Sequence, residues 1–119
     1  MRRRLDDVPI RVLIVDDDPR FRALAAQALV ARGYDVIGEA GTVASARAAV
    51  ASLRPDAVLC DVNLPDGNGL ALAGELRPLR VLLTSSDADA APRRLLARAK
   101  ASFVAKPDFL ATDLRPLLG

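Results

Sequence analysis

The residues best suited to chemistry in this chain of 119 residues are carboxylates that follow apolar segments. Asp16, Asp17 and Asp18 come directly after the segment LIV, and Asp61 comes directly after AVLC. Carboxylates that lie close together raise each other's pKa or recruit a cation. Oxygen ligands without histidine or cysteine suit a hard ion, and a small ligand set that leaves positions for water and phosphate suits Mg²⁺. The sequence therefore predicts a magnesium site, provided that the fold brings these carboxylates together.

The composition excludes several other kinds of site. The chain has no histidine, which removes the commonest general base and the commonest metal ligand. Cys60 is the only cysteine, so no internal disulfide can form, as expected for a reducing compartment. Aromatic residues make up 3 %, and the 17 basic residues nearly balance the 15 acidic ones, so we expect no direct binding of nucleic acid or membrane. With no secretory signal and no long apolar run, we expect a soluble cytoplasmic protein.

Short apolar segments alternate with helical segments through most of the chain. We expect residues 1–8 to form a flexible tail and residues 9–119 to form one domain. Strands are expected at residues 10–15, 34–38, 56–60, 80–84 and 102–105. Helices are expected at residues 19–32, 42–53 with Thr42 as the cap, 69–77, 89–99 and 109–118. This alternation predicts an α/β fold, a flavodoxin-like doubly wound sheet of five parallel strands in the order 2-1-3-4-5 with helices on both faces.

Polar residues stand at the carboxyl ends of four of the expected strands. Asp61 follows the third strand, Thr84 the fourth and Lys106 the fifth, and the aspartate triplet follows the first. Ligands of such sheets bind at the carboxyl ends of the strands, where the strand order reverses. We therefore expect these side chains to converge on one edge. Burying acids there without a function would cost several kcal/mol of unpaired charge, so we interpret them as a functional site.

The aspartate triplet divides into two roles. Asp18 precedes Pro19, the expected first residue of a helix, so its carboxylate is placed to cap that helix. Asp16 and Asp17 then remain for the site. Cys60 is expected in the core, because side chains of neighbouring strand residues point to opposite faces.

Four fragments taken together resemble a known family. LIVDDDP, PDAVLCDVNLPDGNGL, VLLTSS and FVAKP, in this order and at these strand ends, resemble the response-regulator receiver domain of two-component signalling. The resemblance implies that Asp61 is the phosphoacceptor. It implies a Mg²⁺ ion held by Asp16, Asp17, Asp61 and the backbone carbonyl of Asn63. It also implies phosphoryl contacts from Thr84 and Lys106, a switch aromatic at Phe103, a cis Lys106–Pro107 peptide, and tuning of the phosphate lifetime by Asn63 and Ser86.

The resemblance also implies a function. The chain would be a phosphorylation-dependent signalling switch, either standing alone or as the receiver part of a longer regulator, and not a turnover enzyme. Its phosphoryl donor would be a sensor histidine kinase or a phosphotransfer protein. A downstream effector or output domain would contact the face of the fourth helix, fifth strand and fifth helix, in a monomer or a dimer favoured by phosphorylation.

Two alternatives remain open from the residues alone. One is a pseudo-receiver, a docking module that never takes phosphate; the complete set of acidic residues, hydroxyl and lysine argues against it. The other is a phosphatase of the haloacid-dehalogenase type, which also uses an aspartate nucleophile and Mg²⁺. That type needs a second aspartate two residues after the nucleophile, where this chain has Asn63.

Overall fold

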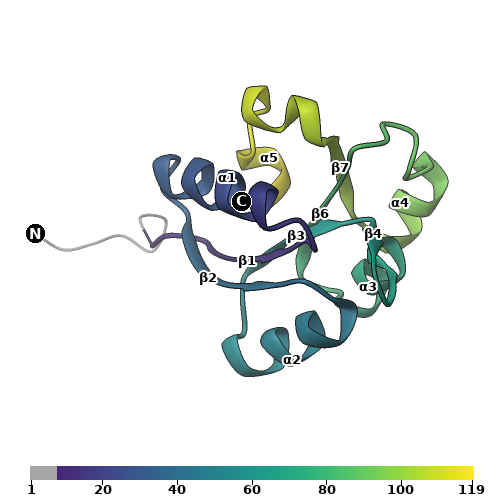
Figure 1. Cartoon of the computed structure of the whole chain (residues 1–119), viewed down its shortest axis with the longest axis horizontal. Coiled ribbons are helices and arrows are strands. Elements are labelled where there is room, and N and C mark those ends of the chain that lie inside the picture. The colour runs from purple at the N-terminus through teal and green to yellow at the C-terminus, as the bar shows by residue number, and fades with distance from the viewer. Residues whose placement is uncertain (1–7) are drawn as a thin grey trace, which may run out of the picture.

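The computed structural model describes residues 8–119, so the expected flexible tail lies outside the described residues except for Val8. Five parallel strands form the central sheet: β1 (Arg11–Val15), β2 (Asp35–Ala40), β3 (Ala57–Asp61), β6 (Arg80–Ser85) and β7 (Ser102–Ala105). Their order is β2-β1-β3-β6-β7 (Figure 1). Because β6 and β7 are the fourth and fifth strands of this sheet, the predicted α/β fold and strand order are confirmed.

Helices cover both faces of the sheet. One face packs against α1 (Pro19–Ala31) and α5 (Arg115–Leu118), and the other against α2 (Val43–Leu53), α3 (Gly69–Glu75) and α4 (Arg93–Ala99). The alternation of side chains along β1 divides the core in the same way. Val12 and Ile14 belong to the cluster on the α1 side, whereas Leu13 and Val15 belong to the opposite one. Cys60 is buried in the latter cluster, as predicted.

Polar side chains fix where the first helices begin. The Asp18 carboxylate accepts a hydrogen bond from the backbone N–H of Arg20, so Asp18 is the N-cap of α1, as predicted. Thr42 caps α2 in a reciprocal arrangement with Ser45. The α1 cap places the two preceding aspartates in the short connection between β1 and the helix.

The end of the chain differs from the expected helix over residues 109–118. It forms a 3₁₀ helix, η2 (Lys106–Ala111), and then the single turn of α5. Pro116 has no N–H and its ring would clash with the carbonyl four residues earlier, so a continuous helix cannot form. The guanidinium of Arg32 also donates hydrogen bonds to the carbonyl oxygens of Leu110 and Thr112, which a helix would have used internally.

The expected cis peptide at Lys106–Pro107 is wrong. This bond is trans, and within residues 8–119 the cis peptide is Arg77–Pro78. Lys106 and Pro107 instead open η2, where proline is tolerated because the first helical N–H groups have no partner within the helix.

A small antiparallel hairpin, β4 (Asn63–Leu64) and β5 (Gly67–Asn68), follows β3 and was not predicted. Its turn residue Asp66 accepts hydrogen bonds from the backbone N–H groups of Val43 and Ala44 at 2.7 and 3.0 Å. These two bonds lower the pKa of Asp66 and attach the hairpin to the start of α2.

The fourth helix is shorter than expected. It begins at Arg93 rather than at residue 89, with Pro92 in the N-cap position. None of the helices in the described part of the chain combines the length and the apolar character needed to cross a membrane.

Candidate functional site

The sheet brings the four predicted strand ends together. Asp61 is the last residue of β3 and lies directly beside Thr84 of β6 in the parallel register. Asp16 follows β1, and Lys106 follows β7. Parallel strands that start at the same side of a sheet also end at the same side, so residues far apart in the sequence converge at one edge.

Three carboxylates form the acidic part of this site. Ligand oxygens of Asp16, Asp17 and Asp61 all lie within 4.8 Å of one another. Asp16 and Asp61 are buried, whereas Asp17 is exposed to solvent. Water therefore has access to the cluster from the Asp17 side. A set of oxygen donors that is partly open to water has the chemistry of a site for Mg²⁺, so these residues fit that ion.

Lys106 is the only ammonium in contact with these carboxylates among the described residues. Its Nζ atom lies 2.8 Å from Asp16 Oδ2 and donates a hydrogen bond to Asp61 Oδ2 at 3.4 Å. Burial opposes the charge of Lys106, but the hydrogen bonds and charges of Asp16 and Asp61 outweigh it, so the pKa of Lys106 is raised. One ammonium facing three carboxylates leaves the site with excess negative charge.

Burial and the excess negative charge of the site both shift the pKa of Asp61. Burial raises the pKa of its carboxyl group, and the neighbouring charge of Asp16 raises it further. Lys106 and the backbone N–H of Asn63 oppose that rise without cancelling it. A cation bound beside Asp61 would favour its ionised form, which is the nucleophilic form of a carboxylate.

Thr84 carries a polar atom without a partner. Its side chain is completely buried, and its hydroxyl oxygen forms no hydrogen bond to any described residue. A buried hydroxyl without a partner costs free energy, on the order of 1–3 kcal/mol. Since Thr84 lies next to Asp61, this hydroxyl is available to a group that binds at the Asp61 carboxylate.

Sequence reasoning missed an aromatic contact to the lysine. Nζ of Lys106 lies 4.6 Å from the centre of the Phe21 ring, and that ring packs edge-on against Phe109 with centres 5.6 Å apart. A cation over an aromatic face is stabilised by the ring's electrons. Phe21 lies on α1, more than 80 residues before Lys106, so no local pattern indicates that its ring faces the ammonium group.

Sequence reasoning also missed the side chain that fixes Asp16. Arg22 donates one hydrogen bond to the backbone carbonyl of Asp16 at 2.6 Å and another to the Glu39 carboxylate at 3.0 Å. The backbone N–H of Asp18 donates to Asp16 Oδ1, which leaves Oδ2 directed to Lys106. Arg22 thus joins the ends of β1 and β2 beside the acidic cluster.

Three further predicted residues lie close in the chain to these strand ends. Asn63 is exposed in β4, and its backbone N–H donates to Asp61 Oδ1 at 3.3 Å. Ser86 is exposed directly after β6, and Phe103 is half-buried on β7. Cys60, although adjacent to Asp61, is no candidate nucleophile, because burial above all raises the pKa of its thiol to about 12.

Gly69 packs directly against the backbone of Asp61 at the end of β3. A Cβ atom built on Gly69 would lie 2.1 Å from the backbone oxygen of Asp61 and 3.0 Å from the Cys60 sulfur. The Gly69 N–H also donates to the Val62 carbonyl at 2.7 Å. The start of α3 can therefore approach the end of β3 this closely only because residue 69 has no side chain.

The fold and the acidic site define a class: a doubly wound α/β domain with its functional residues at the strand ends. Residues 12–115 match the response regulator receiver domain family. The chain therefore belongs to the response regulator receiver domain family, and the resemblance drawn from the sequence is confirmed.

Curated relatives of the chain are longer proteins. Over 103 residues it is 40 % identical to the DNA-binding transcriptional activator DevR/DosR of Mycobacterium tuberculosis. The aligned segment covers 82 % of this chain and 48 % of that protein. The chain is 35 % identical over 116 residues to the transcriptional regulatory protein PdtaR of the same species, which covers 93 % and 56 %. The chain thus spans about half the length of these relatives.

Solved structures share the fold. A two-component response regulator of the LuxR family from Aurantimonas sp. superposes with a TM-score of 0.79 at 26 % identity, covering 87 % of this chain and 79 % of that one. The response regulator domain of Thermotoga maritima CheB superposes with a TM-score of 0.72 at 30 % identity, covering 84 % and 80 %.

Proposed function

We propose that this receiver domain is a phosphorylation-dependent switch that accepts a phosphoryl group on Asp61. The donor is a phosphohistidine of a sensor histidine kinase or of a phosphotransfer protein, since this chain has no histidine of its own. The observation that carries the proposal is the buried Thr84 hydroxyl, which has no partner among the described residues and lies beside Asp61. Lys106 supplies a cation at the same carboxylate.

The transfer itself requires little covalent chemistry from the protein. An Asp61 carboxylate oxygen attacks phosphorus, the bond between phosphorus and the donor imidazole nitrogen breaks, and that nitrogen keeps the electron pair and takes a proton from water. Lys106 and Thr84 would contact the phosphoryl oxygens, one by charge and the other by donating a hydrogen bond. When bound, Mg²⁺ would neutralise negative charge on the phosphoryl group.

Asp16, Asp17 and Asp61 would hold that ion, together with the backbone carbonyl of Asn63. The excess of carboxylates over ammonium groups at this edge supports this assignment. The ion would have a second effect, because its positive charge favours the ionised form of Asp61, the form that attacks phosphorus.

Phosphorylation would then act on the neighbouring strands. A hydrogen bond from Thr84 to the phosphoryl group would shift the end of β6, and Phe103 on the adjacent β7 would turn into the space released. Asn63 and Ser86, both exposed next to the site, would set how readily water reaches the phosphorus atom.

A mass measurement separates this proposal from its two alternatives. With acetyl phosphate and Mg²⁺, the protein should gain the mass of one phosphoryl group, and excess chelator or Asp61→Asn should abolish the gain. A pseudo-receiver would gain no mass under any of these conditions. A phosphatase would release phosphate from p-nitrophenyl phosphate with multiple turnovers, which would contradict the proposal.

A further inference from the structure

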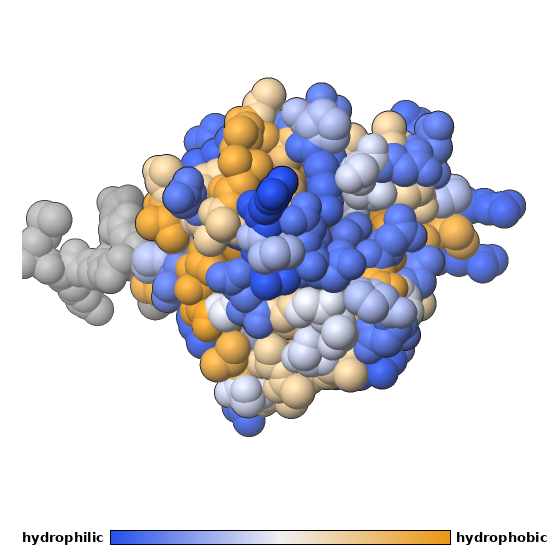
Figure 2. Space-filling view, viewed as in Figure 1, coloured by the Kyte–Doolittle hydropathy of each residue, from blue (hydrophilic) through white to orange (hydrophobic). Residues whose placement is uncertain are grey.

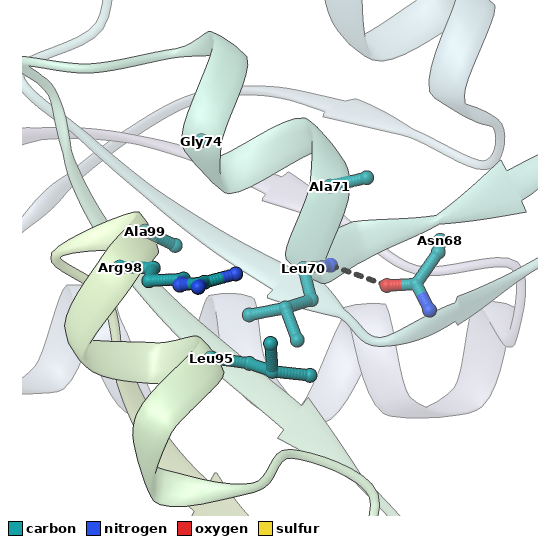
Figure 3. A pocket seen from close by; sticks show the side chains of 7 residues that line it. All are labelled: Asn68, Leu70, Ala71, Gly74, Leu95, Arg98 and Ala99. Atoms are coloured by element: carbon teal, nitrogen blue, oxygen red, sulfur yellow. Dashed lines mark hydrogen bonds between the residues drawn. The ribbon is translucent and has the colours of Figure 1, made fainter.

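An open apolar groove lies between α3 and α4, away from the acidic site. It has a volume of about 410 Å³, within the range of ligand-binding pockets. Leu70 of α3 and Leu95 of α4 extend toward each other across it (Figure 3). Gly74 and Ala71 leave it hollow on the α3 side, because neither has a bulky side chain.

The polar groups at the groove are hydrogen-bond donors. The Arg98 guanidinium reaches from α4 toward Leu70 (Figure 3). The Asn68 amide uses its oxygen to accept from the Leu70 N–H, so its nitrogen remains free to donate outward. Among the residues that the structure describes, no carboxylate lines the groove. An occupant must therefore offer apolar groups for the two leucines and acceptors for the two donors.

More positive charge surrounds the groove. Arg94 lies one helical turn before Arg98, and Arg77 donates a hydrogen bond to the Arg98 carbonyl at 3.5 Å. Lys100 follows directly after α4. Within residues 8–119, none of these four basic side chains forms an ion pair. On the side of the molecule where α4 lies, hydrophilic residues flank patches of apolar surface (Figure 2).

We propose that the groove between α3 and α4 binds an acidic amphipathic segment of a partner protein. Apolar side chains of that segment would fill the space between Leu70 and Leu95, and its carboxylates would pair with Arg98 and Arg94. A second copy of this chain is a poorer occupant, because a symmetric contact would bring the same cations of the two copies face to face. The groove is present in the unphosphorylated protein, so that form is the one to test.

The test uses the 119-residue chain and a fluorescent peptide, EELLEELLEELL. Anisotropy should show binding that weakens with salt, and amide NMR shifts should be largest at Leu70, Leu95 and Arg98. Two peptides serve as controls: one with alanine for leucine removes the apolar contacts, and one with lysine for glutamate reverses the charge. Both should bind at least about tenfold more weakly, because each loses one of the two complementary features.

Matched variants complete the test. Arg98→Glu should weaken binding of the acidic peptide at least about tenfold, whereas Arg20→Glu on α1, on the other face of the sheet, should leave it unchanged. Both side chains are exposed, so both variants should fold. No binding, equal binding by Arg98→Glu, or shifts confined to another face would overturn the proposal. Self-association through the groove would overturn it in favour of a second copy.

Discussion

Gly69→Ala should displace Asp61, the proposed phosphoacceptor, without altering any side chain of the acidic site. The new Cβ would lie 2.1 Å from the Asp61 carbonyl oxygen, whereas real Cβ atoms essentially never come closer than 3.0 Å. The two backbones must therefore separate by about 0.9 Å, the difference between these distances. A misplacement of roughly 1 Å can reduce the rate of a positioned reaction about 100-fold. Overpacking of this kind also lowers the free energy of unfolding by ~1–3 kcal/mol.

The assay is the initial rate of phosphorylation by acetyl phosphate at saturating Mg²⁺, with the free energy of unfolding measured in urea on the same samples. Gly74→Ala is the matched control in the same helix, because its Cβ would meet nothing within 4 Å. It should keep the wild-type rate and gain up to about 1 kcal/mol of stability from the better helix former. A wild-type rate in folded Gly69→Ala protein would refute the claim that this close approach positions Asp61.

Four further substitutions probe the acidic site. Asp61→Asn should stabilise the metal-free protein, because burial and Asp16 raise the pKa of Asp61 and make its ionised form unfavourable. The gain should be absent below the ordinary carboxyl pKa, where Asp61 is protonated in both states, should grow between that value and the higher folded pKa, and should be constant above it. Phe21→Leu should slow phosphorylation roughly 2- to 30-fold, the value of one cation–π contact, and should remove the ring-current shift of the Lys106 side-chain protons. Asn63→Arg and Ser86→Leu should each prolong the life of the phosphoprotein after donor removal, since both crowd the path of water, while Mg²⁺ dependence persists.

Each of these expectations has a definite contrary result. If wild type and Asp61→Asn had the same free energy of unfolding in urea at neutral pH without metal, ionised Asp61 would not destabilise the fold. Unchanged Lys106 proton shifts in Phe21→Leu would show that the Phe21 ring does not contact the Lys106 ammonium group. Unchanged decay in both lifetime variants would show that water approaches the phosphorus atom by another path.

The sheet and the convergence of the acidic site were predictable from the sequence. Short apolar strands buried on both faces alternate with capped helices, and that pattern permits few topologies. Once the strand order was set, the positions of Asp16, Asp61, Thr84 and Lys106 followed from their places at the strand ends, because parallel strands end at one edge.

Features that depend on contacts between distant residues were not predictable. The last helix was expected over residues 109–118; Pro116 is a local signal against a continuous helix that was overlooked, whereas the bonds from Arg32 to two carbonyl groups exist only in the folded chain. The roles of Phe21 and Arg22 were missed for a similar reason. Each belongs to α1 in the sequence, and its contact to Lys106 or to the Asp16 carbonyl exists only after the sheet has assembled.

Asp61 itself is proposed to carry the phosphoryl group. Borohydride reduction of the acyl phosphate, followed by proteolysis and tandem mass spectrometry, locates the modified carboxyl group directly. After reaction with acetyl phosphate and Mg²⁺, we expect reduction at Asp61 and at no other carboxyl group, with none in excess chelator. Reduction at Asp16 or Asp17, or the same labelling at Asp61 without Mg²⁺, would contradict it.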